Sequence, residues 1–104
     1  MNTEEQLAQI KKEIPNIANA FNAFFLQLMK DGALNGKTKE LIALGIAVAQ
    51  RCESCIRIHV KKCLAAGCTR EEILESAGVA VLMQGGPAYT NLPIVLDSLK
   101  STTD

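Results

Sequence analysis

Two cysteines and the only histidine of the chain stand at helical spacing. Cys52 and Cys55 are three positions apart, and His59 follows four positions after Cys55. In a helix, at about 100° per residue, these side chains fall on one stripe, with neighbouring Cβ atoms about 5–6 Å apart. Two thiols at that distance can form a disulfide, and a histidine one turn further along can act as a base. The motif therefore predicts dithiol–disulfide redox chemistry.

The motif is expected at the start of a helix, which favours the reactive thiolate form of cysteine. Unpaired backbone N–H groups and the positive end of the helix dipole stabilise an anion there. Arg51 and Lys62 are expected to project nearest to Cys55 and to stabilise its thiolate. Arg57 and Lys61 are expected to face away into solvent.

Glu40 is a charged residue on an otherwise apolar helix face, which it shares with Ala43, Leu44 and Ala47. A simple structural explanation is the preference of acidic residues for the first turn of a helix. If the helix of Glu40 and the cysteine helix fold back on each other around Gln50, however, position 40 lies opposite position 60. The carboxylate is then within reach of His59 and would orient the imidazole as a base for a thiol.

Helical periodicity runs along the chain, and strand signals are almost absent. Helices are expected over residues 3–12, 16–30, 38–50, 52–66 and 69–85, and a last helix opens near Pro87 and is interrupted at Pro93. Thr38 is the expected cap of the third helix, and Thr69 with Glu72 reads as a capping box for the fifth. The sequence predicts an all-α, single-domain bundle of about five to six helices over residues 1–104.

Composition and charge narrow the expected setting. Eleven basic and eleven acidic side chains cancel, so no nucleic acid partner and no anionic membrane surface is expected. The longest apolar runs, such as residues 41–49, are shorter than the ~20 residues of a membrane span. The amino terminus is acidic and polar, unlike a signal peptide, so a cytoplasmic location is expected. In that reducing compartment, catalysis, metal binding or burial must explain the four cysteines.

Glu40, followed after eleven residues by Cys52-x-x-Cys55-x-x-x-His59, resembles the signature of the AhpD-like alkylhydroperoxidases within the carboxymuconolactone decarboxylase superfamily. Residues 39–44, 65–67, 71–73 and 85–88 are also similar to that family. The resemblance covers about residues 15 to 100. It implies an all-helical fold and a homo-oligomer, commonly a trimer or a hexamer.

The resemblance also implies an activity, that of a dithiol peroxidase or a disulfide reductase. Its substrate would be a peroxide or a disulfide, and an external thiol donor would restore the dithiol. Glu40 would match the acidic member of a proton relay and His59 its base. Cys55 would be the deeper thiol that attacks, and Cys52 the more exposed thiol that resolves the intermediate. Ser54 stands where the best-studied family type has a histidine, and a serine cannot act as a base near neutral pH.

A zinc site is the main alternative, since Cys52, Cys55, His59 and Cys63 could each ligate a metal. On one helix, however, Cys52 and Cys63 are about 16 Å apart, too far for one zinc ion. A three-ligand site, or a site shared between subunits, stays open. A structural protein without redox catalysis also stays open, with buried thiols and a core histidine. Our interpretation is catalytic, with no metal and no cofactor, and with Cys63 and Cys68 as buried thiols.

The helix expected over residues 16–30 has an apolar face without an obvious partner. Apolar side chains recur there at intervals of three and four residues, at Ile17, Phe21, Phe24, Phe25 and Leu28. A chain of 104 residues builds only a modest core. We therefore expect the region of Phe21, Phe24 and Phe25 to be partly buried against other subunits of a homo-oligomer.

Overall fold

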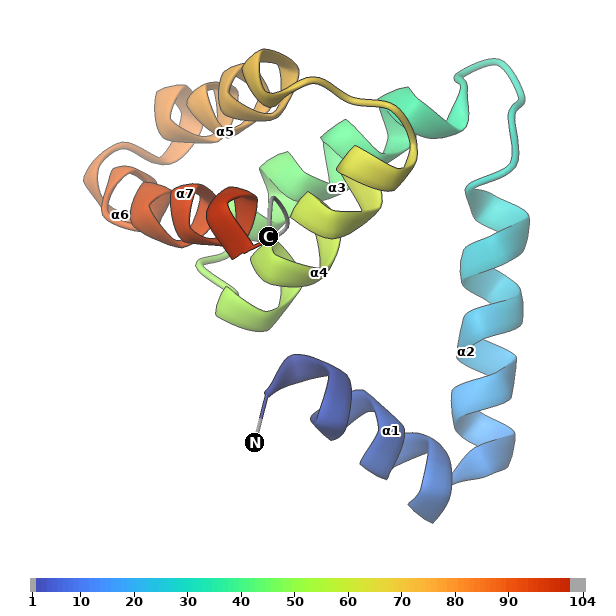
Figure 1. The fold of residues 1–104 in the computed structure, drawn as a ribbon. Helices are drawn as coiled ribbons and strands as arrows, with labels where there is room; N and C mark the ends of the chain where they lie inside the picture. Colours follow the sequence, from blue (N-terminus) through green and yellow to red (C-terminus); the bar gives the residue numbers. More distant parts are fainter. Residues whose placement is uncertain (1, 102–104) are drawn as a thin grey trace.

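The structure is a computed structural model that describes residues 2–101 (Figure 1). Within this range every regular element is a helix, as the sequence predicts. The helices are α1 (Thr3–Glu13), α2 (Pro15–Leu28), α3 (Gly36–Ala49), α4 (Glu53–Ala65), α5 (Arg70–Gln84), α6 (Gly86–Tyr89) and α7 (Leu92–Ser101). No helix among these residues is long and apolar enough to cross a membrane.

Side-chain caps set the starts of several helices. The Oδ1 atom of Asn35 accepts a hydrogen bond of 2.8 Å from the N–H of Thr38, so α3 begins at Gly36. The expectation that Thr38 caps this helix is wrong, because Asn35 is the extended residue directly before the helix and its side chain already supplies the capping acceptor. The capping box of Thr69 and Glu72 at the start of α5 is confirmed.

The last helix of the sequence prediction is two helices in the structure. The break lies at Thr90 and Asn91, between α6 and α7, rather than at Pro93 itself. Pro93 lies in the first turn of α7, where its missing N–H leaves no helical hydrogen bond unmade. Pro87 opens α6 in the same way.

The hydrophobic core is shared by α3, α4, α5 and α7. Helix α3 packs against both α4 and α5, and α7 packs against α4 (Figure 1). The largest completely buried apolar side chains are Leu44, Val48, Ile56, Val60, Ile73 and Val95. This packed group of helices holds the motif residues of α3 and α4 in place.

Helices α1 and α2 form an arm that stands away from the core (Figure 1). Neither helix has a buried residue, and the side chains of Phe21 and Phe24 are 67% and 62% exposed. The ammonium of Lys39 on α3 holds the end of the arm, because it donates to the carbonyl oxygens of Leu28 at 2.7 Å and Lys30 at 2.8 Å. The arm is therefore fixed at the α2–α3 connection and carries an uncovered apolar face.

Candidate functional site

A tight turn between α3 and α4 places the two cysteines. Arg51 has a φ of 56°, a left-handed conformation that reverses the chain after Gln50. The N–H of Cys52 then donates to the carbonyl oxygen of Ala47 at 3.1 Å, which fixes Cys52 at the end of α3. The predicted fold-back of the two helices around Gln50 is confirmed.

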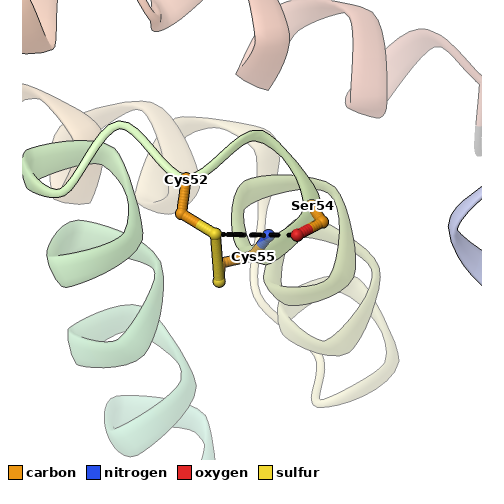
Figure 2. The surroundings of a disulfide bond; sticks show 3 residues. All are labelled: Cys52, Ser54 and Cys55. Carbon is orange, nitrogen blue, oxygen red and sulfur yellow. Dashed lines mark hydrogen bonds between the residues drawn. A yellow bond between two sulfur atoms is a disulfide. The ribbon is translucent and has the colours of Figure 1, made fainter. Parts of the chain in front are cut away.

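Cys52 is the N-cap of α4, and its sulfur forms a disulfide with Cys55 (Figure 2). The two Cα atoms are 5.2 Å apart, within the usual range for a disulfide. Both residues are half-buried, and Cys55 packs against the hydrophobic core. The predicted pairing of the two thiols at the start of a helix therefore matches the geometry.

Two groups of the first turn of α4 contact the sulfur of Cys52. The backbone N–H of Cys55 donates to it at 3.3 Å, and the hydroxyl oxygen of Ser54 lies 3.6 Å away (Figure 2). In the part of the chain that the structure describes, the sulfur of Cys55 has no hydrogen bond of this kind. The two thiols of the motif thus have different surroundings.

Glu40 and His59 meet between α3 and α4. The Nδ1 atom of His59 lies 2.9 Å from Oε1 of Glu40, and the carboxylate is buried, with 6% of the residue exposed. Among the described residues, Nε2 of His59 has no hydrogen-bond partner. Every completely buried side-chain nitrogen or oxygen atom of these residues does have a partner. Nε2 is therefore not completely buried. The predicted proximity of Glu40 and His59 is present.

Phe25 of α2 lies beside His59, a contact that the sequence does not predict. The two ring centroids are 6.3 Å apart, and the ammonium of Lys62 lies 4.2 Å from the centroid of the Phe25 ring. This cation–π contact differs from the expected role of Lys62 beside Cys55. The periodicity of α2 does not distinguish among its five apolar positions. Only the tertiary structure therefore reveals which aromatic ring lies beside the histidine.

The expectation that Arg57 and Lys61 are merely solvated is wrong. Arg57 forms ion pairs with Asp97 at 2.7 Å and Glu53 at 3.2 Å, and these carboxylates raise the pKa of its guanidinium. Lys61 pairs with Glu4 of α1 at 3.2 Å. The partners Asp97 and Glu4 come from α7 and α1, and the periodicity of α4 alone does not reveal contacts with other helices.

Cys63 and Cys68 are both buried, as the sequence predicts. Burial raises the pKa of each thiol, so both remain protonated near neutral pH. Among residues 2–101, no group of three or more histidine, cysteine or acidic side chains is arranged to hold a metal ion.

Comparison with known proteins identifies the family. Residues 15–97 match the model of the carboxymuconolactone decarboxylase family. This chain belongs to that family. The resemblance inferred from Glu40, Cys52, Cys55 and His59 is thereby confirmed, as is the all-helical fold.

Several known proteins are similar to this chain over most of its length. A carboxymuconolactone decarboxylase family protein from Legionella pneumophila, solved in its apo form, is 40% identical, with a TM-score of 0.87 over 97% of this chain and 90% of that one. A family protein from Thermotoga maritima is 29% identical, with a TM-score of 0.74 over 82% and 88%. The uncharacterized protein 4 in the cox locus of Paracoccus denitrificans is 38% identical over 82% of this chain and 77% of its own length.

Proposed function

We propose that this protein is a dithiol–disulfide oxidoreductase that reduces peroxides or disulfides with Cys52 and Cys55. The observation that carries the proposal is the position of this cysteine pair at the N-terminus of α4, one turn before a histidine held by a buried carboxylate. Membership of the family supports the fold and the motif. For the Thermotoga maritima relative a role in an antioxidative response has been suggested.

The Glu40–His59 pair suits a base for Cys55. With Nδ1 donating its proton to the Glu40 carboxylate, the lone pair of the neutral imidazole is on Nε2, an atom that is not completely buried. His59 is one helical turn after Cys55, so the two side chains lie on the same face of α4. Glu40 acts through His59 and is a positioning residue.

The proposed cycle transfers two electrons. With a peroxide ROOH, a thiolate of the pair attacks one oxygen, ROH leaves, and a cysteine sulfenic acid forms. The second thiol displaces water from that sulfenic acid and gives the Cys52–Cys55 disulfide. With a disulfide substrate, two successive thiol–disulfide exchanges give the same product and two substrate thiols. An external thiol donor then reduces the protein disulfide.

The protein acts as a homo-oligomer in this proposal. A folded monomer of this mass exposes about 5,700 Å², whereas this chain exposes 6922 Å². The excess, about 1,200 Å², is larger than the roughly 800 Å² that each partner loses in a standard interface. The uncharged apolar face of α2 is the surface that a second copy would cover, and by resemblance the assembly is a trimer or a hexamer.

Turnover assays test the proposed activity. The reduced protein, recycled with dithiothreitol, is expected to reduce a small aromatic disulfide, hydrogen peroxide or an organic hydroperoxide faster than dithiothreitol alone. Cys52→Ser and Cys55→Ser should each abolish the acceleration, while Cys68→Ala, which alters a thiol outside the motif, should retain it. No acceleration with any of the three substrates would contradict the proposed function.

A further inference from the structure

The surroundings of the two motif thiols point to a division of roles between them. We propose that Cys52, rather than Cys55, is the thiolate of the resting reduced protein and makes the first attack. Ser54 is a positioning residue, whose hydroxyl stabilises this thiolate. This inference rests on the proposed function. It reverses the order of attack that the position of His59 alone suggests.

The first observation is the chemistry of the helix caps. Side-chain oxygens cap α1, α3 and α5, supplied by Asn2, Asn35 and Thr69. At α4 the cap is the sulfur of Cys52, which accepts the N–H of Cys55 at 3.3 Å. A neutral thiol is a weak acceptor, while a thiolate is a strong one, so the N-cap position stabilises the anion of Cys52 over its thiol.

The second observation is the hydroxyl of Ser54, 3.6 Å from the same sulfur (Figure 2). Neither a disulfide sulfur nor a thiolate carries a proton, so the hydroxyl must be the donor in both states. A histidine at this position could take up a proton near neutral pH, whereas a serine hydroxyl cannot and can only donate its hydrogen bond to the sulfur. Residue 54 is therefore suited to hold a preformed thiolate rather than to generate one.

The third observation is the different environment of Cys55. Its residue packs against the hydrophobic core, and none of the described residues donates a hydrogen bond to its sulfur. Core packing disfavours the charged form of a thiol. Cys55 is thus suited to stay protonated until His59, one turn away, removes its proton in the second step.

The charged groups around the pair leave this order intact. Arg51 precedes Cys52 in the turn from α3. Glu53 follows it on α4, and its carboxylate is ion-paired with Arg57 at 3.2 Å. Glu40 of α3 is hydrogen-bonded to His59 rather than to either cysteine. The negative charge nearest in sequence, that of Glu53, is therefore partly neutralised by Arg57.

The two steps balance for a disulfide substrate RSSR′. The Cys52 thiolate attacks one sulfur, and the substrate S–S bond breaks. R′S⁻ leaves, and a mixed disulfide between Cys52 and the RS group forms. His59 accepts the proton of Cys55 at Nε2. The Cys55 thiolate attacks the sulfur of Cys52 and releases RS⁻. The dithiol is oxidised by two electrons, and the substrate is reduced to two thiols.

Alkylation with iodoacetamide across a pH series tests the assignment without any substrate. Cys55→Ser leaves Cys52 as the only motif thiol, and Cys52→Ser leaves Cys55. Peptide mapping by mass spectrometry separates the motif from Cys63 and Cys68. We expect the pH midpoint of the alkylation rate to be lower for Cys52 than for Cys55. Adding Ser54→Ala should raise the Cys52 midpoint by about one pH unit, the scale of one hydrogen bond to a charged group, and Ser54→Thr should restore it.

Two outcomes would overturn the inference: a lower midpoint for Cys55 than for Cys52, or a Cys52 midpoint that Ser54→Ala leaves in place. These readings are independent of turnover. A wild-type protein that turns over substrate but alkylates first at Cys55 refutes only the division of roles. A protein that turns over no disulfide or peroxide refutes the proposed function, and the alkylation midpoints still decide which cysteine holds the charge.

Discussion

The Nδ1 atom of His59 and the Oε1 atom of Glu40 lie 2.9 Å apart, across the contact between α4 and α3. The two residues are 19 positions apart in the chain and meet because both helices run regularly from the turn at Gln50. A buried carboxylate without a partner is costly, so this hydrogen bond stabilises the fold as well as the orientation of the imidazole. The proposed chemical role of this hydrogen bond and its structural role can be measured separately, by the alkylation rate of Cys55 and by the melting temperature.

We expect Glu40→Gln and His59→Ala each to slow the alkylation of Cys55 near neutral pH, measured in the Cys52→Ser background. A slowing of roughly tenfold or more fits the loss of a positioned base. The double variant should be little slower than either single variant, because the two groups act as one unit. The slowing should fade at high pH, where hydroxide ionises the thiol directly.

Glu75→Gln, an exposed acidic residue of α5, is the matched control and should leave this rate unchanged. If Glu40→Gln lowers the melting temperature but leaves the rate and its pH profile as in the parent, Glu40 is a structural residue. The proton relay would then have no experimental support.

The buried thiol of Cys63 predicts a loss of stability at alkaline pH. Burial raises its pKa above the usual 9.0, so above that pH the unfolded chain releases a proton that the folded chain retains. Fewer protons on the unfolded state mean that the free energy of unfolding falls as pH rises, by up to about 1.4 kcal/mol per pH unit for one thiol. Urea denaturation between pH 8 and about pH 10.5 measures this slope.

Cys63→Ala removes the titrating group and should flatten that slope, although the cavity lowers stability at every pH. Cys68→Ala tests the same effect for the second buried thiol, whose pKa burial also raises. A Cys63→Ala variant with the same alkaline slope as the wild type would show that other groups cause it.

Regular helices account for most of what the sequence predicts, since periodicity fixes which side chains share a face. This regularity placed Glu40 opposite His59 and the two cysteines on one turn. The left-handed Arg51 could not be predicted, because arginine has no preference for that conformation. The pairing of Arg57 with Asp97 depends on how α7 packs against α4, 40 residues later in the chain. The sulfur cap of α4 was missed because cysteine is not among the usual cap residues.

The capping box at the start of α5 predicts a measurable loss of stability. Thr69→Ala removes the acceptor for the N–H of Glu72, at 3.1 Å, and should lower the free energy of unfolding by about 1 kcal/mol. The pKa of Glu72 is lowered, first by the backbone N–H of Thr69 and then by Lys37. Its contribution to stability is therefore present above the usual pKa of 4.5 and is lost as pH falls below it.

Urea denaturation at neutral pH checks Thr69→Ala, and Glu72→Gln should flatten the acid limb of the stability curve. Thr90→Ala, which removes a hydroxyl outside any N-cap, is the comparison variant. A Thr69→Ala protein as stable as the wild type would contradict the role of the box.

The apolar face of α2 predicts self-association. Sedimentation of the wild-type protein at micromolar concentration should show an oligomer. Phe21→Glu or Phe24→Glu should dissociate it, because each puts a charge into an apolar contact. Asn19→Asp, on the opposite face of the same helix, adds a charge without touching that contact and should leave the assembly intact. A monomeric wild-type protein would contradict the proposal.

The central claim, a reversible Cys52–Cys55 disulfide, is tested most directly by counting thiols before and after mild oxidation. The reduced wild-type chain has four thiols, and a slight excess of diamide followed by denaturation and alkylation should leave two, as mass spectrometry reports. Dithiothreitol should restore all four. Cys52→Ser should keep its three thiols under the same treatment, whereas Cys63→Ala should fall from three to one. A wild-type protein that keeps four thiols, or a Cys52→Ser protein that still loses a pair within one chain, would contradict the account.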